Sequence, residues 1–126
     1  MKIRTTDVFS VQDTLCVEFS SLFGNGIAFW HGTKPNIGDV LDVELELDEV
    51  FSWKENIDLS SDTTPKITVN DGIQIITGEL INDTDGCAVL KIGDSVILVE
   101  LDQPVPHELG FVDVRATAIH LYPTNI

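Results

Sequence analysis

Hydrophobic and polar residues alternate with a period of two along most of the chain. The clearest stretch is residues 42–48, in which Val43, Leu45 and Leu47 alternate with four acidic residues. Successive side chains of a strand point to opposite faces, so this stretch predicts a strand with one apolar and one acidic face. A helical period of 3.6 is not sustained anywhere in the sequence.

The same pattern predicts about seven or eight mostly antiparallel strands in one domain, 1–126. A spacing near ten residues is typical of a small all-β barrel or sandwich. The expected strands lie at residues 14–20, 26–32, 39–48, 65–70, 72–81, 87–92, 95–101 and 111–122. Gly93 and Asp94 predict a tight hairpin of the primed type, and residues 82–86 predict a turn.

At most one or two short helices are expected. Residues 48–61 are the best helical candidate, although they fit equally well a strand continuation followed by an acidic loop. Residues 102–110 fit a loop or a short helical bridge. The run from 72 to 101 is almost continuously apolar on both strand faces, which predicts central strands or an outer face covered by another surface.

The chain is strongly acidic. Seven Lys and Arg stand against 21 Asp and Glu, which gives a formal net charge of −14. Such a surface repels phosphate backbones and anionic lipids, so we expect no direct binding to nucleic acid or membranes. Residues 39–62 hold nine acids and one base, a net charge of −8 in 24 residues. A basic protein is the natural electrostatic partner of this segment.

The cysteines and the N-terminal segment indicate the cellular compartment of the protein. Cys16 and Cys87 each lie in an apolar, strand-like run, which predicts buried free thiols in a reducing compartment; one disulfide between them is the alternative. The first residues, MKIRTTDVFSVQ, show no apolar core of a signal peptide, and no segment has the apolar length of a transmembrane helix. We therefore expect a cytoplasmic protein.

Motifs of catalysis and metal binding are missing from the sequence. Nothing local pairs His31, His107 or His120 with a cysteine, and no G-x-S-x-G motif occurs. The NDTDG run at 82–86 fails as a calcium loop because isoleucines occupy the positions of the first and last oxygen ligands. The C-x-x-C and H-x-x-x-H spacings of zinc sites are also absent. We expect no enzyme activity, no metal and no cofactor, and interpret His31 and His120 as ordinary strand residues.

The acidic stretch is the candidate partner-binding site. Its carboxylates would steer a basic protein toward it, and two aromatic side chains would supply buried anchors. The expected site consists of Asp42, Glu44, Glu46, Asp48, Glu49, Phe51, Trp53, Glu55 and Asp58. The alternatives are that Phe51 and Trp53 belong to the core beneath a solvated acidic face that keeps the protein soluble, or that the acidic strand prevents edge-to-edge aggregation.

The end of the chain resembles a known family of folds. Alternating residues lie at Gly110, Val112, Val114, Ile119, Leu121 and Tyr122. This pattern resembles the closing strand of small oligonucleotide/oligosaccharide-binding-type barrels. The resemblance implies a five-stranded, partly open barrel with a ligand face and long loops. The basic and aromatic binding face of those barrels is absent here, so their binding to nucleic acid is not expected.

Three classes of function remain open. The first is a stoichiometric inhibitor that occupies the basic cleft of a cationic nuclease or toxin. In size, charge and lack of catalytic residues, the chain is similar to bacterial immunity proteins that neutralise cognate toxins. The second is an adaptor or assembly module, monomeric or homodimeric, that docks through a sheet edge or its apolar strands. The third is a small hydrolase or ligand-binding barrel, which would require a deep pocket with a perturbed titratable group.

Overall fold

The structure, a computed structural model, describes residues 1–82, 87–105 and 110–124, and all regular structure in these ranges is β-strand. The predicted all-β fold is confirmed. The described residues include no helix, and therefore no helix able to cross a membrane. The strands are β1 (Lys2–Val11), β2 (Thr14–Ser21), β3 (Gly24–Trp30), β4 (Val40–Glu46), β5 (Val50–Phe51), β6 (Ile57–Leu59), β7 (Lys66–Asn70), β8 (Ile73–Asn82), β9 (Cys87–Ile92), β10 (Ser95–Leu101), β11 (Phe111–Ala116) and β12 (His120–Pro123).

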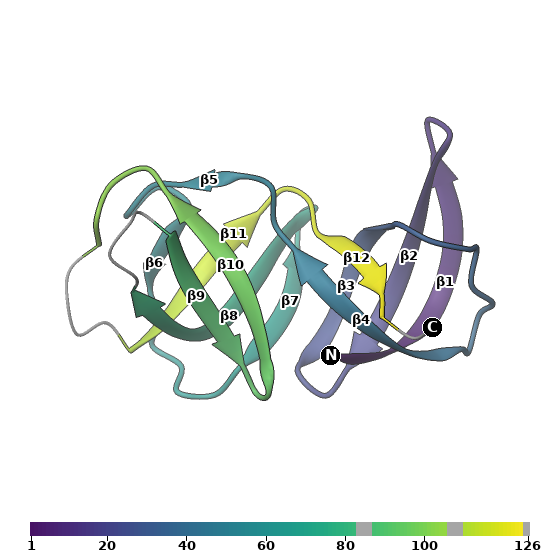
Figure 1. Ribbon diagram of the computed structural model, residues 1–126, viewed down its shortest axis with the longest axis horizontal. Helices are drawn as coiled ribbons and strands as arrows, with labels where there is room; N and C mark the ends of the chain where they lie inside the picture. Colours follow the sequence, from purple (N-terminus) through teal and green to yellow (C-terminus); the bar gives the residue numbers. More distant parts are fainter. Residues whose placement is uncertain (83–86, 106–109, 125–126) are drawn as a thin grey trace.

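Five strands close into a barrel, here called the N-terminal barrel (Figure 1). β1 pairs with β2 on one side and with β4 on the other, and β2 pairs with β3, all antiparallel. β12 then fills the gap, parallel to β3 and antiparallel to β4. Phe19, Trp30 and Leu45 are buried in its interior. The barrel is therefore completed by a strand from the far end of the sequence.

The remaining strands, β5 to β11, form a second unit, here called the C-terminal lobe. β8 is its central strand: β11 runs along one side, and β7 and then β9 pair along the other. The sheet continues from β9 to β10 and β5, and from β11 to β6. Gly78 lies where β8 changes partner from β7 to β9. A Cβ atom there would lie 2.6 Å from the Lys91 carbonyl oxygen, so a larger residue would push β9 away.

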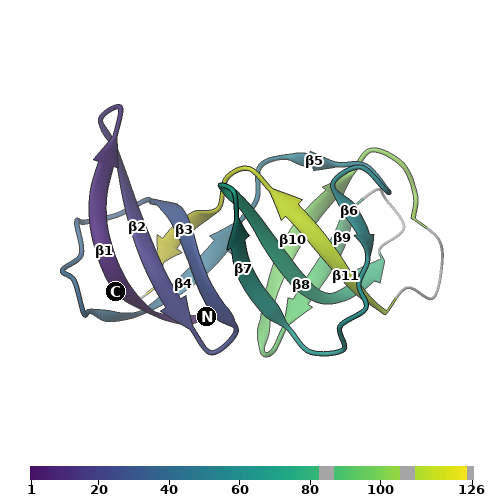
Figure 2. The same cartoon turned by 180° about the vertical axis from the view of Figure 1, so that it is seen from behind.

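The two units lie side by side, and the chain crosses between them twice (Figures 1 and 2). It leaves the N-terminal barrel at residues 47–49 and returns at residues 117–119. A third contact joins β3 to β7, where Gly24 pairs with Ile67 and the Ile67 amide donates to the Phe23 carbonyl at 2.8 Å. Buried side chains form one hydrophobic cluster that includes residues of both units.

The structure has twelve strands in its described residues instead of seven or eight. β1 was not expected. Residues 48–61 contain β5 and β6 around a turn in which Lys54 has a φ of 70°, instead of a helix. The segment 111–122 divides into β11 and β12. The hairpin at Gly93 and Asp94 is confirmed, with Ile92 and Ser95 paired. The turn at 82–86 lies largely, and His107 wholly, outside the described residues. The bridge at 102–110 lies partly outside them, and its described residues 102–105 and 110 are not helical.

The prediction of two buried free thiols is half correct. Both cysteines are unpaired, and Cys16 is buried with 4% of its surface exposed. Cys87, however, is exposed. Its neighbour Ala88 faces the core, as do the alternate residues Leu90 and Ile92, so the first residue of β9 points to solvent. Lys91 shares the face of Cys87 by alternation, and its charge is the local signal that this face meets solvent.

Candidate functional site

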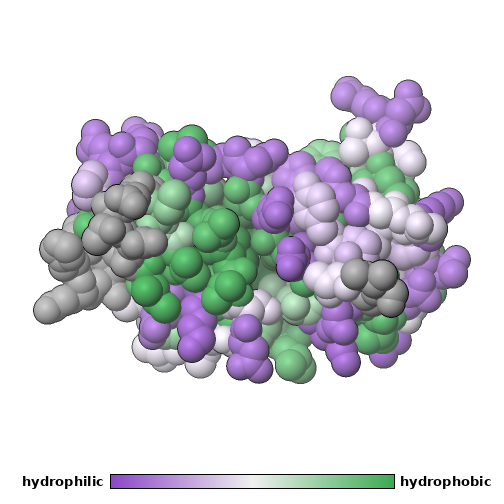
Figure 3. Space-filling model, in the orientation of Figure 1, coloured by the Kyte–Doolittle hydropathy of each residue, from purple (hydrophilic) through white to green (hydrophobic). Residues whose placement is uncertain are grey.

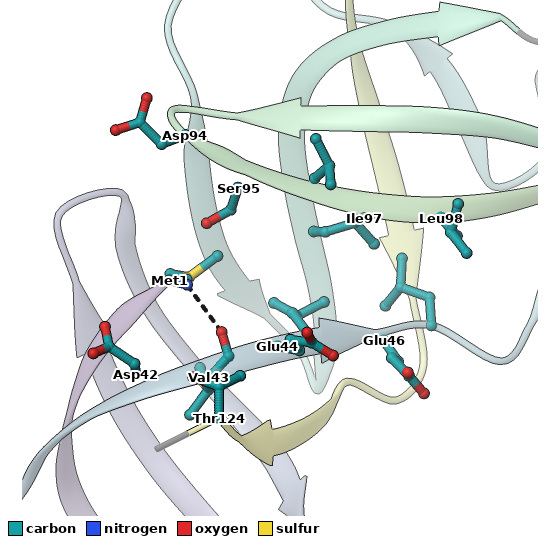
Figure 4. A pocket seen from close by; sticks show the side chains of 13 residues that line it. Met1, Asp42, Val43, Glu44, Glu46, Asp94, Ser95, Ile97, Leu98 and Thr124 are labelled. Carbon is teal, nitrogen blue, oxygen red and sulfur yellow. Dashed lines mark hydrogen bonds between the residues drawn. The ribbon is translucent and has the colours of Figure 1, made fainter. Parts of the chain in front are cut away.

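A groove of about 800 Å³ lies between the N-terminal barrel and the C-terminal lobe. Its walls are β4 and the start of β10, with the turn of the β9–β10 hairpin at one end. In Figure 4, Glu44 and Glu46 extend from β4 on one side, and Leu98 extends from β10 on the other. Met1 lies at the same end as the hairpin turn, and its nitrogen donates a hydrogen bond to the Val43 carbonyl at 2.9 Å.

β4 carries a row of exposed carboxylates along the groove. Asp42, Glu44 and Glu46, here called the acidic row, point outward, whereas Val43 and Leu45 are buried in the barrel. The alternation predicted from the sequence is therefore confirmed for this strand. Carboxylates two residues apart on one strand face are separated by about 6.6–6.8 Å along the strand.

Within the part of the chain that the structure describes, no Lys or Arg side chain forms an ion pair with the acidic row. Side chains of the described residues form two ion pairs, and neither involves the row. By strand register the nearest base is Lys2, which lies opposite Asp42 on β1 without forming an ion pair. Glu44 and Glu46 have ring side chains opposite them on β12. Their negative charge is therefore available to a partner.

Four neighbouring rings form a column beside the acidic row, and we call them the ring column. In spatial order they are Tyr122, His31, His120 and Phe29. The centroids of Tyr122 and His31 are 4.4 Å apart with nearly parallel planes, and the next two steps are 5.0 Å and 5.3 Å. The parallel pairing of β12 with β3 places His120 beside Phe29. The sequence reasoning did not bring these rings together, because that pairing has no local signature.

The two histidines of the ring column are hydrogen-bonded to each other. His31 Nε2 lies 2.8 Å from His120 Nδ1, and His120 Nε2 lies 3.3 Å from an Asp48 carboxylate oxygen. A hydrogen bond between two ring nitrogens needs one of them as donor and the other as acceptor. No Ser, Thr or Cys side chain of the described residues is hydrogen-bonded to either ring, so this pair has no nucleophile to activate among them.

Glu49 is engaged inside the molecule. Its carboxylate accepts hydrogen bonds from the backbone N–H and the hydroxyl of Thr117, both at 2.9 Å, and from the Ala118 N–H at 3.3 Å. These contacts join the segment that leaves the N-terminal barrel to the segment that returns to it. Glu49 therefore links the two crossing segments through hydrogen bonds. Because its carboxylate is already bonded within the molecule, we do not count it as part of the candidate binding surface.

The other expected site residues lie on the C-terminal lobe, apart from the acidic row. Phe51 is fully buried, so its side chain is not accessible to a partner. Trp53 is half-buried and packs against the core. Glu55 is exposed, and the half-buried Asp58 accepts a hydrogen bond from the Leu59 N–H at 3.0 Å. The nine residues proposed from sequence thus do not form one continuous epitope.

The C-terminal lobe presents aliphatic side chains across the groove from the acidic row. Ile81, Val89 and Leu98 lie side by side on adjacent strands, with Val96 next along β10. We call these four residues the apolar face; Val96 is 65% exposed and Leu98 is 72% exposed. Figure 3 shows the hydrophobic area that they help to form, next to hydrophilic side chains at the boundary with the barrel. The sequence predicted that residues 72–101 form central strands or have an outer face covered by another surface. The described residues do not cover Val96 and Leu98.

Cys16 is one of the residues that line a second, smaller cavity of about 180 Å³, together with residues of β1, β3 and the 117–119 crossing. Phe9, Phe29 and Ile119 are among its mainly apolar lining residues. Burial raises the pKa of the Cys16 thiol above its ordinary value of 9.0. A neutral thiol is a poor nucleophile, so this cavity lacks the low-pKa cysteine of a catalytic site.

Comparisons with protein-family models, with curated proteins and with solved structures find no match to this chain. The site must therefore be interpreted from its own geometry. Within residues 1–82, 87–105 and 110–124, no three His, Cys, Asp or Glu side chains are placed to hold a metal ion. What the groove offers is negative charge on one wall and apolar surface on the other.

Proposed function

We propose that the chain is a non-catalytic binding protein whose acidic row engages a basic protein. The observation that carries this proposal is the row itself: Asp42, Glu44 and Glu46 are exposed along a groove and form no ion pair with a Lys or Arg of the described residues. Asp48 lies at the end of the row and extends it toward the ring column. Tyr122 and His31 replace Phe51 as the aromatic side chains available beside the carboxylates.

Electrostatics favour such a partner. Two unit charges about 6.7 Å apart repel by about 0.6 kcal/mol in water, so the row destabilises the free protein slightly. A cationic surface placed on the row removes this repulsion and gains attraction. Complementary charge also accelerates association, and raised salt slows it. The same field disfavours nucleic acids and anionic membranes as partners.

The most concrete form of the proposal is a stoichiometric inhibitor, similar in profile to bacterial immunity proteins. Its acidic row would occupy the phosphate-binding cleft of a cationic nuclease or toxin. The proposed location is the cytoplasm, which the two unpaired cysteines support. The exposed Val96 and Leu98 favour a second candidate, an assembly module that docks on a larger complex through its apolar face.

The test reverses charge in the acidic row. We expect Glu44→Lys/Glu46→Lys to keep its stability, because both side chains face solvent, and to lose about 2–5 kcal/mol of binding free energy toward the basic partner. The partner is captured on the immobilised protein at low salt, identified, and produced recombinantly. Association is then measured across a range of salt concentrations by surface plasmon resonance.

A matched control carries the same charge change elsewhere. Asp7 and Glu18 are exposed and lie opposite each other on β1 and β2. Asp7→Lys/Glu18→Lys should bind almost as well as the unaltered protein. Equal losses in the two double variants would show that net charge alone matters, and unaltered binding by Glu44→Lys/Glu46→Lys would contradict the proposal.

A further inference from the structure

β10 has a free backbone edge that faces the groove. In a hairpin with a two-residue loop, the residues on either side of the loop, here Ile92 and Ser95, form a hydrogen-bonded pair. The backbone groups of Ser95 and of every second residue after it therefore form hydrogen bonds with β9. Val96 and Leu98 therefore direct their N–H and C=O groups to the opposite edge. Among the described residues, the only strand on that edge is β5, and its pairing begins at Glu100. The backbone groups of Val96 and Leu98 are thus left without a strand partner there.

β4 presents a free edge from the other wall. The Val43 N–H donates to the Met1 carbonyl at 2.8 Å, and the Thr124 N–H donates to the Asp42 carbonyl on the opposite side, at 2.9 Å. Backbone groups two residues apart on a strand point to the same side, so those of Leu45 point to the same side as those of Val43. Leu45 lies past the position of Met1, so its backbone groups face the groove. No strand of the described residues pairs with Leu45 there.

The groove therefore lies between two strand edges. In Figure 4, β4 and β10 converge where Glu46 and Leu98 lie and diverge toward Met1 and Asp94. Its interior side is backed by apolar side chains that include Met1, Val43 and Ile97. Its outer side is bordered by the acidic row on β4 and by the apolar face on β10. We call the apolar interior side the floor of the groove and the outer side its rim. A ligand in the groove would need apolar side chains toward the floor and basic side chains toward the carboxylates of the rim.

We propose that the groove binds an extended segment of a basic protein as an added β-strand, with apolar residues alternating with Lys or Arg. This inference rests on the proposed function and specifies the form of the partner. The segment pairs through its backbone with the free edge of β10 at Val96 and Leu98. Its apolar side chains point to the floor, and its basic side chains point outward to Glu44 and Glu46.

The match in spacing and charge favours this occupant. Alternate side chains of a strand are about 6.6–6.8 Å apart, which is also the spacing of the acidic row. Backbone hydrogen bonds supply affinity in strand addition, and side chains on alternate positions supply specificity. A second copy of this chain also carries a formal net charge of −14, so like charges oppose that occupant.

The experiment uses a synthetic peptide as the probe. It has about seven residues, the common length of a short strand, with Lys and Val alternating and both ends blocked. An isomer of the same composition, with all its lysines before its valines, matches its charge without the strand pattern. A third peptide is the alternating one with N-methyl groups along one edge. Binding is followed by fluorescence anisotropy at low salt and by the amide NMR signals of Leu45, Val96 and Leu98.

We expect the alternating peptide to bind about tenfold more tightly than either the isomer or the N-methylated peptide, because both lose paired hydrogen bonds. It should shift the amide signals of Val96 and Leu98. In the protein, Val96→Pro removes the edge N–H without touching the β9 ladder and should weaken binding about tenfold. Val96→Thr keeps that N–H and a similar shape, and should bind within about threefold of the unaltered protein.

Each remaining outcome overturns the inference in a recognisable way. If all three peptides bind equally and Val96→Pro has no effect, while Glu44→Lys/Glu46→Lys abolishes binding, the acidic row acts by charge alone and strand addition is wrong. If the charge-reversed protein binds the alternating peptide normally, the proposed function fails as well. If the NMR signals respond to protein concentration without any peptide, the occupant is a second copy of this chain. The N-methylated peptide keeps the test valid if Val96→Pro does not fold.

Discussion

The two walls of the groove share one burial pattern and differ in chemistry. On β4 the buried residues Val43 and Leu45 alternate with exposed carboxylates, whereas on β10 the buried Ile97 and Val99 alternate with exposed aliphatic residues. The inward residues are constrained by the core on both walls. The outward residues have no such constraint, so core packing does not explain why one wall carries carboxylates and the other carries Val96 and Leu98. Under the proposal, the carboxylates of β4 meet the basic side chains of the partner segment, and the free edge of β10 pairs with its backbone.

The largest expected effect is a loss of stability, and it tests whether the N-terminal barrel and the C-terminal lobe unfold together. Phe19 fills the N-terminal barrel and Phe51 the C-terminal lobe, and both are fully buried. We expect Phe19→Ala and Phe51→Ala each to cost about 3–5 kcal/mol of unfolding free energy. Because buried residues of both units belong to one cluster, each variant should unfold in a single transition by circular dichroism and calorimetry. Two separate transitions, one of them unaltered, would show that the units fold independently.

The next effect compares one thiol from each unit. Exposed Cys87, on the C-terminal lobe, should react with a thiol reagent at least about a hundredfold faster than Cys16, on the N-terminal barrel, because Cys16 is shielded from solvent and burial raises its pKa. Cys87→Ser and Cys16→Ser isolate the two rates, and denaturation should bring the rates together. Fast native labelling at Cys16 would show that the small apolar cavity opens to solvent.

The Cys16 thiol also gives a pH dependence with a definite sign. Its pKa is raised in the folded state by burial, so the unfolded chain ionises first as pH rises. The contribution of this burial to stability is complete below the ordinary value of 9.0 and is lost as pH rises toward the raised folded value. Cys16→Ala should remove this alkaline decline from denaturation curves, and Cys87→Ala should leave it in place.

A smaller loss of stability is expected when the hydrogen bonds of Glu49 between the two crossing segments are removed. Glu49→Ala removes the acceptor of hydrogen bonds from Thr117 and Ala118 and should cost about 1–2 kcal/mol. The control, Glu55→Ala, truncates an exposed acid and should stay within about 0.5 kcal/mol of the unaltered protein. Hydrogen exchange of the Thr117 amide should rise only in the first variant. Equal costs would mean that the Glu49 contacts contribute nothing specific.

The smallest effect is expected on the apolar face. Leu98→Thr should change stability by less than about 0.5 kcal/mol, because the side chain faces solvent. Ile97→Thr, one residue earlier, places a hydroxyl in the core and should cost several times more. Chemical denaturation of the two variants measures the contrast. A large loss for Leu98→Thr would mean that the apolar face is part of the fold and not a surface kept for binding.

Local patterns in the sequence were sufficient where they concern one strand. The alternation around Val43 and Leu45 predicted a buried and an acidic face, and both are present. The burial of Phe51 was foreseen as an alternative to its role as an anchor. Lys91 lies on the same strand face as Cys87, and its charge marks that face as the solvent side. The prediction of a buried Cys87 overlooked this signal.

Contacts between distant segments were beyond such reasoning. His31 and His120 are 89 residues apart in the chain and meet because β12 is inserted between β3 and β4. Each histidine looks like an isolated strand residue in the sequence. The groove likewise depends on how β4 and β10 face each other, and these strands share no pairing that a sequence pattern could encode.

The insertion of β12 between β3 and β4 also sets an order of events on the ribosome. Residues 50–116 contain every strand of the C-terminal lobe in one continuous stretch, so that lobe can assemble while synthesis continues. The N-terminal barrel, although made first, keeps the facing edges of β3 and β4 unpaired until residues 120–123 emerge. Open strand edges are templates for aggregation. The carboxylates of β4 would therefore protect the nascent chain at its most exposed stage, before any partner is met.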